Sequence, residues 1–161
     1  MAQADIYADL KRDHDKHREM LAELGELKGD GAKRKELFER FRVEIAAHAA
    51  AEEESLYATM LGNPELLDEA RHSVAEHKEV DDLIGEMMEL DFASDEWESK
   101  FFHMRHRYEH HIEEEEEEMF PAAAKKLDDA TEEKLAEVFE ERKPKELELA
   151  KEAPAGADER E

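Results

Sequence analysis

Four long segments of this sequence repeat an apolar residue every three or four positions, which is the period of an α-helix. Short stretches rich in glycine, proline and capping residues separate the segments, at 29–31, 62–64 and 91–94. The pattern predicts helices over about 3–28, 32–61, 64–90 and 95–120. We expect Asn63 to cap the third helix with Pro64 in its first position, Ser94 to cap the fourth helix, and Pro121 to end or kink it.

Long helices joined by short loops pack antiparallel, so we predict an all-α fold, an up-down-up-down four-helix bundle. The predicted bundle covers residues 1–127. A further helical segment at 128–152, interrupted by Pro144, is expected to pack on the bundle only weakly. We expect residues 153–161 to form a disordered tail.

The absence of cysteine from the 161 residues excludes disulfides and thiolate-bound metals. Any metal must therefore be held by imidazole or oxygen ligands, which favours iron, manganese or zinc.

The chain carries a formal net charge of −24. Such a surface repels phosphate backbones and anionic lipids, so we predict neither a nucleic-acid nor a membrane partner. We find no secretion signal and no apolar run of transmembrane length, and therefore expect a soluble cytoplasmic protein. Whether the acidity reflects a high-salt habitat stays open.

Histidine interrupts the apolar stripe of every long segment, and glutamate also interrupts two of them. A buried carboxylate costs several kcal/mol unless it is paired or bound to a metal. A metal cluster would satisfy all these groups together, and a core of hydrogen-bonded histidines and glutamates is the alternative. The interrupting residues are His14, His48, Glu52, His77, His111 and Glu115.

An internal repeat selects these six residues as candidate metal ligands. His14 and His48 are 34 residues apart, as are His77 and His111, and the two halves are offset by 63 residues. The same offset relates Glu52 to Glu115. Each half thus supplies one histidine and one His-x-x-x-Glu motif, whose spacing places both side chains on one helix face.

The other polar residues are interpreted more conservatively. Of the six consecutive glutamates at 113–118, only Glu115 fits both the repeat and the stripe, so we expect the other five to form a solvated face. The alternative is that Glu114 or Glu118 touches the site. We likewise expect His72, His103, His106 and His110 to lie away from the site. His17, one turn from His14, is either a hydrogen-bond partner of a ligand or a spare ligand. Tyr57 and Tyr108 are interpreted as core residues near the site, and no catalytic residue is predicted.

The segments DH at 13–14, HAAAEEESLY at 48–57, EH at 76–77 and HIEEEEEEMFP at 111–121 resemble the hemerythrin-like, or HHE cation-binding, family. The resemblance covers about residues 5–125. It implies two iron ions with an oxo or hydroxo bridge, four terminal histidine ligands and two bridging carboxylates. It also implies binding of dioxygen, peroxide or nitric oxide at an open metal position.

Two departures from the family pattern bear on function. Oxygen-carrying members have a fifth histidine where this chain has Ser73, so reversible oxygen storage loses weight relative to peroxide-consuming or nitric oxide chemistry. Ala58 stands where proline is frequent, which should affect helix geometry and not ligation.

Three functional classes remain open from sequence. The first is a di-iron protein that binds dioxygen, with catalase-like turnover of peroxide as a possible activity. The second is a binding module without catalysis that senses oxygen, nitric oxide or iron, or stores oxygen. The third is a bundle with zinc or no metal. Ferritin-like bundles, which use Glu-x-x-His on two helices, fit poorly because that motif occurs here once, at Glu69–His72. We expect a monomer or a weak homo-oligomer.

Overall fold

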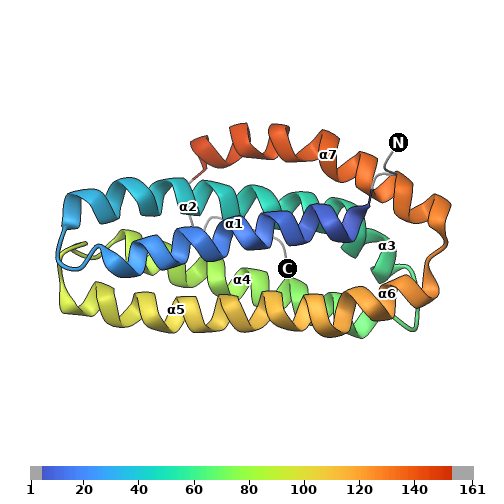
Figure 1. Ribbon diagram of the computed structural model, residues 1–161, viewed down its shortest axis with the longest axis horizontal. Coiled ribbons are helices and arrows are strands. Elements are labelled where there is room, and N and C mark those ends of the chain that lie inside the picture. Colours follow the sequence, from blue (N-terminus) through green and yellow to red (C-terminus); the bar gives the residue numbers. More distant parts are fainter. Residues whose placement is uncertain (1–4, 154–161) are drawn as a thin grey trace.

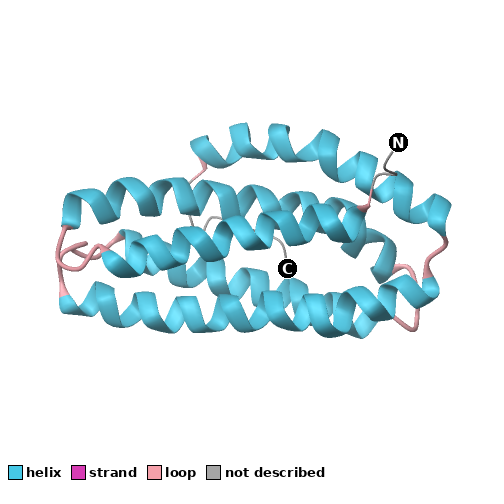
Figure 2. Ribbon diagram, in the orientation of Figure 1, coloured by secondary structure: helices cyan, strands magenta, loops and turns pink. Residues whose placement is uncertain are grey.

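The computed structural model describes residues 5–153, and every regular element within them is helical (Figure 2). Four long helices form the body of the molecule: α1 (Ile6–Glu26), α2 (Gly31–Glu52), α4 (Leu67–Met88) and α5 (Asp95–Glu114). They lie side by side and alternate in direction (Figure 1). The prediction of an antiparallel four-helix bundle is confirmed.

Local sequence signals explain most of the helix ends. Asp5 caps α1 and Asp30 caps α2, each accepting a hydrogen bond from a backbone N–H of the first turn. Ser94 caps α5 as predicted, with 3.1 Å between its Oγ and the Trp97 nitrogen. Gly29 has φ 73°, a left-handed conformation that favours glycine and lets the chain reverse between α1 and α2.

The start of the third long helix differs from the prediction. Asn63 does not cap it, because its side chain accepts from the nitrogen of Glu65 in a tight turn and the helix begins only at Leu67. Residues 64–66 thus belong to the connection rather than to the helix.

Both prolines are tolerated within helical structure. Pro121 does not end the fourth helical segment, which continues as α6 (Phe120–Lys126) after a short π-helical segment, and Pro121 stands in the first turn of α6. Pro144 does not interrupt α7 (Asp129–Glu152), which is continuous through it.

The α7 helix crosses the α1–α2 face of the bundle (Figure 1). Leu135, Ala136 and Phe139 are buried against the bundle. Arg42 of α2 also donates to the carbonyl oxygens of Ala150 and Ala153, at 3.2 and 2.7 Å. The packing of α7 is therefore firmer than the sequence suggested. The predicted disordered tail, apart from Ala153, lies outside the described residues.

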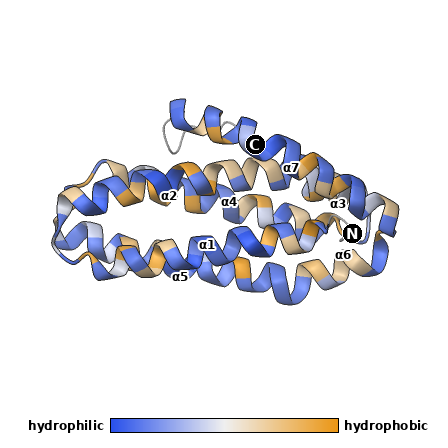
Figure 3. Ribbon diagram, turned by 45° about the horizontal axis from the view of Figure 1, so that its top comes forward, coloured by the Kyte–Doolittle hydropathy of each residue, from blue (hydrophilic) through white to orange (hydrophobic). Residues whose placement is uncertain are grey.

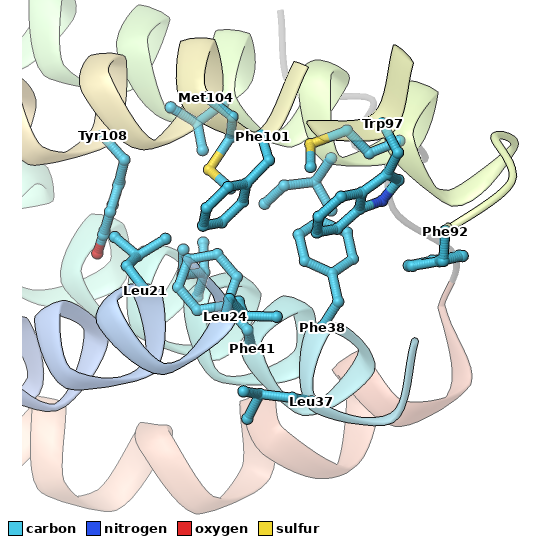
Figure 4. Close-up of a cluster of buried hydrophobic side chains, with 14 of the residues drawn as sticks. Leu21, Leu24, Leu37, Phe38, Phe41, Phe92, Trp97, Phe101, Met104 and Tyr108 are labelled. Carbon is cyan, nitrogen blue, oxygen red and sulfur yellow. The ribbon is translucent and has the colours of Figure 1, made fainter. Parts of the chain in front are cut away.

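Apolar side chains form two separate core clusters along the bundle. One lies toward the α1–α2 and α4–α5 connections and includes Leu24, Phe38, Trp97 and Phe101 (Figure 4). The other, which includes Ile6, Leu56, Phe120 and Phe139, lies toward α3 (Ala58–Leu61) and α6. Orange apolar positions recur along the long helices among blue polar ones (Figure 3).

None of the helices in residues 5–153 is both long and apolar enough to cross a lipid bilayer.

Candidate metal centre

The six predicted ligands lie between the two apolar clusters, in the middle of the bundle. On α1, for example, His14 lies between Leu10 of one cluster and Leu21 of the other. All six side chains are buried, with Glu52 and His14 at 0% exposure and His77 the most exposed at 8%. They are His14, His48, Glu52, His77, His111 and Glu115.

The six residues form two clusters of three. His14, His48 and Glu52 make one and His77, His111 and Glu115 the other, with the candidate ligand atoms of each cluster within 4.8 Å of one another. The ring centroids are 5.1 Å apart in the first histidine pair and 4.8 Å apart in the second.

Each glutamate contacts histidines from both clusters. Glu52 Oε1 lies 3.5 Å from His48 Nε2 and 3.4 Å from His77 Nε2. Glu115 lies 2.9 Å from His111 Nε2 through Oε1 and 3.4 Å from His14 Nε2 through Oε2. The two carboxylates therefore stand between the two histidine pairs, where a carboxylate that bridges two ions would have to lie.

The outward nitrogens of the four histidines are each matched to a further carboxylate. His48 Nδ1 lies 2.8 Å from Asp13 and His111 Nδ1 lies 2.9 Å from Glu76, the residue preceding the lone histidine of the same half. Such contacts fix the ring so that Nε2 faces the interior, as is typical of metal-binding histidines.

The lone histidines reach carboxylates of the opposite half. His14 Nδ1 lies 2.7 Å from Glu116, and His77 Nδ1 lies 3.3 Å from Glu53. Glu53 and Glu116 obey the same 63-residue offset as the ligands, so the surroundings of the centre are repeated as well. The expectation that Glu116 is solvated is wrong, and the repeat was the signal that could have identified both residues.

Several inward atoms have no hydrogen-bond partner among the described residues. They are His14 Nε2, His48 Nε2, both oxygens of Glu52 and Glu115 Oε2. Buried polar atoms without partners are costly, and several of them converging on one space fit a bound cation. Imidazole nitrogens and carboxylate oxygens suit iron, manganese or zinc.

Without a cation, neighbouring carboxylates favour the protonated forms of His14 and His111. Burial lowers the pKa of His14, but Glu115 and Glu116 outweigh burial and raise it to about 9. Burial also lowers the pKa of His111. The nearby carboxylates of Glu115 and Glu76 have the larger effect, so the pKa of His111 is raised to about 10. A cation would replace these protons as the positive charge that the carboxylates require.

Two π-helical segments adjoin the glutamates. η1 (Glu53–Tyr57) begins directly after Glu52, and η2 (Glu115–Met119) begins at Glu115. A π-helical turn widens the helix and changes the direction of the following side chains, and such turns are frequent at functional sites. The sequence patterns gave no signal for them.

Two tyrosines lie beside the centre. The Tyr57 hydroxyl donates to Glu115 Oε1 and lies 3.4 Å from His77 Nε2. Burial, together with the charges of Glu115 and Glu52, raises the pKa of Tyr57 well above 10, so it stays a neutral phenol. Tyr108 shares a 2.7 Å hydrogen bond with His17 Nδ1.

His17 lies outside both three-residue clusters, although it is fully buried. Burial lowers its pKa to about 4, so the ring is neutral near pH 7. The other histidines set aside from the sequence, His72, His103, His106 and His110, are all exposed.

Comparison with known proteins agrees with this geometry. The family model described as Hemerythrin HHE cation binding domain matches residues 5–123. The chain belongs to the hemerythrin HHE cation-binding family. A crystal structure of a Hemerythrin HHE cation binding domain-containing protein from Mycobacterium kansasii aligns with a TM-score of 0.79 and 23% sequence identity. The alignment covers 92% of this chain and 90% of that one. No curated protein matches the chain.

Membership of the HHE family confirms the resemblance seen in the sequence, and the M. kansasii structure confirms the fold. The histidine and glutamate clusters of this hemerythrin-like bundle are groups that could bind metal. The identity and number of the ions are a matter for proposal.

Proposed function

We propose that this hemerythrin-like protein holds two iron ions between its four long helices and binds dioxygen or a related small ligand there. In this proposal His14 and His48 hold one ion, His77 and His111 hold the other, and Glu52 and Glu115 bridge them. By resemblance to the family, an oxo or hydroxo group would complete the bridge.

The observation that carries the proposal is the placement of the two glutamates. Each approaches Nε2 of its own His-x-x-x-Glu motif and Nε2 of the lone histidine in the other half. A purely hydrogen-bonded core would pair these atoms, yet several of them lack partners among the described residues. Two cations would satisfy all of them together.

A bound iron pair would supply redox chemistry and a position where a small ligand binds. The chain itself orients the imidazoles through Asp13, Glu76, Glu53 and Glu116. Tyr57 keeps a proton on its hydroxyl, beside Glu115 and His77, and could donate a hydrogen bond to a ligand. The apolar clusters on both sides exclude bulk water.

Metal analysis tests the ligand assignment. We expect about two irons per chain in protein produced in iron-sufficient medium, as in other carboxylate-bridged bundles. Glu52→Ala or Glu115→Ala should lower that count sharply, and Glu52→Gln should do so while preserving side-chain volume. Circular dichroism checks that each variant is folded. His110→Ala is the matched control, because His110 is exposed and neighbours the predicted ligand His111. A full iron count in the glutamate variants would contradict the assignment.

Two optical and kinetic measurements separate the functional classes. An oxo-bridged diferric centre absorbs at the ultraviolet edge of the visible range and bleaches on reduction, whereas a zinc protein is colourless. Oxygen release from hydrogen peroxide would support catalase-like turnover. Reversible binding of oxygen without turnover would instead support the storage or sensing alternative.

A further inference from the structure

Beside the candidate metal centre, a pocket of about 340 Å³ opens between α4 and the α5–η2 segment. Its inner wall includes His111 and Glu115 of the centre, and Ser73 and Met119 also line it. Glu115 is 1% exposed, and its Oε2 lacks a hydrogen-bond partner among the described residues. The pocket therefore connects the surface with a buried carboxylate of the candidate centre.

Three side chains at this pocket form a further group with metal-ligand geometry, which we call the outer cluster: His72, Glu76 and Glu114. His72 Nε2 lies 3.3 Å from Glu76 Oε1 and 3.7 Å from Glu114 Oε1. The candidate ligand atoms of all three residues lie within 4.8 Å of one another, so a single cation could contact all of them. Glu76 also accepts from His111 Nδ1, which links the outer cluster directly to the centre.

The rest of the pocket is strongly acidic. Asp68, Glu69 and Glu118 complete its lining. Burial, followed by the charges of Glu118 and Glu114, raises the pKa of Glu69. A concentration of negative charge of this kind attracts cations and raises their local concentration.

The internal repeat shows that this face differs from its counterpart in the other half. The 63-residue offset relates Glu69, Glu114 and Glu118 to Ile6, Ala51 and Ser55. These three counterparts are buried, and Ile6 and Ala51 belong to the cluster that contains Leu135 and Phe139 of α7. One half thus has small or apolar residues under a covering helix, and the other has three carboxylates around an open pocket.

The two halves also differ at the carboxylates that contact His48 and His111, the histidines of the His-x-x-x-Glu motifs. Asp13, which contacts His48, is paired with Lys143 of α7 at 2.7 Å. Its counterpart Glu76, which contacts His111, lies against His72 instead. On the α7 side, Lys143 provides the positive charge beside Asp13. On the α4–α5 side, Glu76 and His72 could instead bind a metal cation from solution.

We propose that the outer cluster is a third cation site, through which divalent iron loads into the centre from the α4–α5 face. The proposal rests on the proposed function for the destination of the ion. Because His72 is more than half exposed, the outer cluster should bind more weakly than the centre, as a site of transit requires.

The test compares wild-type protein with His72→Ala/Glu114→Gln, which leaves every proposed ligand of the centre in place. Apoprotein is mixed anaerobically with ferrous iron at low ionic strength, quenched with a chelator at intervals, and its retained iron is counted. We expect the variant to load roughly tenfold more slowly and to reach the same final count. The matched control is His103→Ala/Glu113→Gln, which changes two exposed residues in the same way and should load at the wild-type rate.

Calorimetric titration with Co²⁺ measures the third site directly. Wild-type apoprotein should bind one weak equivalent beyond those of the centre, and His72→Ala/Glu114→Gln should lose it. Glu52→Ala/Glu115→Ala should lose the tight equivalents and retain the weak one, so failure of the centre is distinguishable from failure of the outer cluster. A weak equivalent that persists in His72→Ala/Glu114→Gln, or equal loading rates, would overturn the proposal.

Discussion

At the scale of single residues, the carboxylates that hold the imidazoles matter as much as the imidazoles themselves. Asp13 and Glu76 precede the lone histidines His14 and His77, and they fix the rings of His48 and His111 on the neighbouring helices. Because a ring oriented in advance loses less freedom on binding a cation, these contacts should contribute to metal affinity.

We therefore expect Asp13→Asn to weaken iron binding by about 10- to 100-fold without unfolding the protein. The amide keeps the size of the side chain but removes the charge that His48 and Lys143 share. Competition with a chelator measures the affinity. Asp15→Asn is the control, since Asp15 is exposed and pairs only with Arg18 among the contacts described for it. Equal affinity in both variants would contradict the role of Asp13.

The raised pKa values of His14 and His111 predict a pH dependence for metal-free protein. Both histidines bind protons more tightly in the folded state than in the unfolded state, where their pKa has the usual value of 6.5. The reason is that Glu115, together with Glu116 beside His14 and Glu76 beside His111, stabilises the charged rings. Their contribution to stability is complete below about pH 6.5 and is lost as pH rises through about 9 and 10. Urea unfolding of apoprotein should thus show stability falling from pH 7 to pH 9.

The iron-loaded protein is the comparison for this pH series. A bound cation takes the place of the protons, so its stability should fall less, or rise, over the same range. Parallel losses with and without iron would show that His14 and His111 do not face the metal.

At the scale of elements, the π-helical segments adjoin the glutamate of each repeated motif, and α7 packs beside the motif of the first half. η1 and η2 follow or contain the glutamate of each half, and at these positions Glu53 contacts His77 and Glu116 contacts His14. On a regular α-helix, Glu116 would point about 100° away from Glu115. This explains why the apolar stripe predicted a solvated position.

Within residues 5–153, the α7 helix packs mainly on α1 and α2, which belong to the first half of the repeat. Its Lys143 reaches Asp13 and Glu44, and its Phe139 packs beside His48 with ring centroids 6.0 Å apart. We propose that residues 128–152 are an extension that completes the bundle of residues 1–127 rather than a separate domain.

Phe139→Ala should accordingly destabilise the whole protein by about 3 kcal/mol, since it leaves a cavity between α7 and the bundle. Phe102→Ala is the matched control: Phe102 is 53% exposed, and its loss should cost no more than about 0.5 kcal/mol. Urea unfolding followed by circular dichroism measures both. A small effect of Phe139→Ala would show that α7 is not part of the cooperative unit.

At the scale of the whole molecule, the net charge of −24 works against compactness. Ion pairs such as Lys16–Glu44 and Arg142–Glu54 offset part of it, but acidic residues outnumber basic ones by 47 to 23. Folding concentrates this charge, so the folded state suffers more repulsion than the unfolded chain.

We therefore expect the urea midpoint of apoprotein to rise as salt increases from about 0.01 to 0.5 M, because the ions screen this repulsion. Sodium chloride and tetramethylammonium chloride, both with a chelator present, should act equally if screening is the cause. A midpoint that stays constant or falls would show that attractive ion pairs dominate. A rise with sodium alone would indicate specific cation binding.

The sequence alone determined the four helices and the six candidate ligands. Helical periodicity shows which face is buried, and a buried His-x-x-x-Glu repeated 63 residues apart is too costly without a common partner. His14, His48 and Glu52 followed from the apolar stripes and the internal repeat, as did their counterparts His77, His111 and Glu115.

Only the tertiary structure decided which groups surround these ligands. The contact of His14 with Glu116 joins residues 102 positions apart in the sequence. The packing of α7 on α1 and α2 depends on the position of a fifth long helix relative to the bundle. Periodicity carries information about the faces of a single helix, whereas these contacts depend on the distances between helices and on the π-helical turns that redirect side chains.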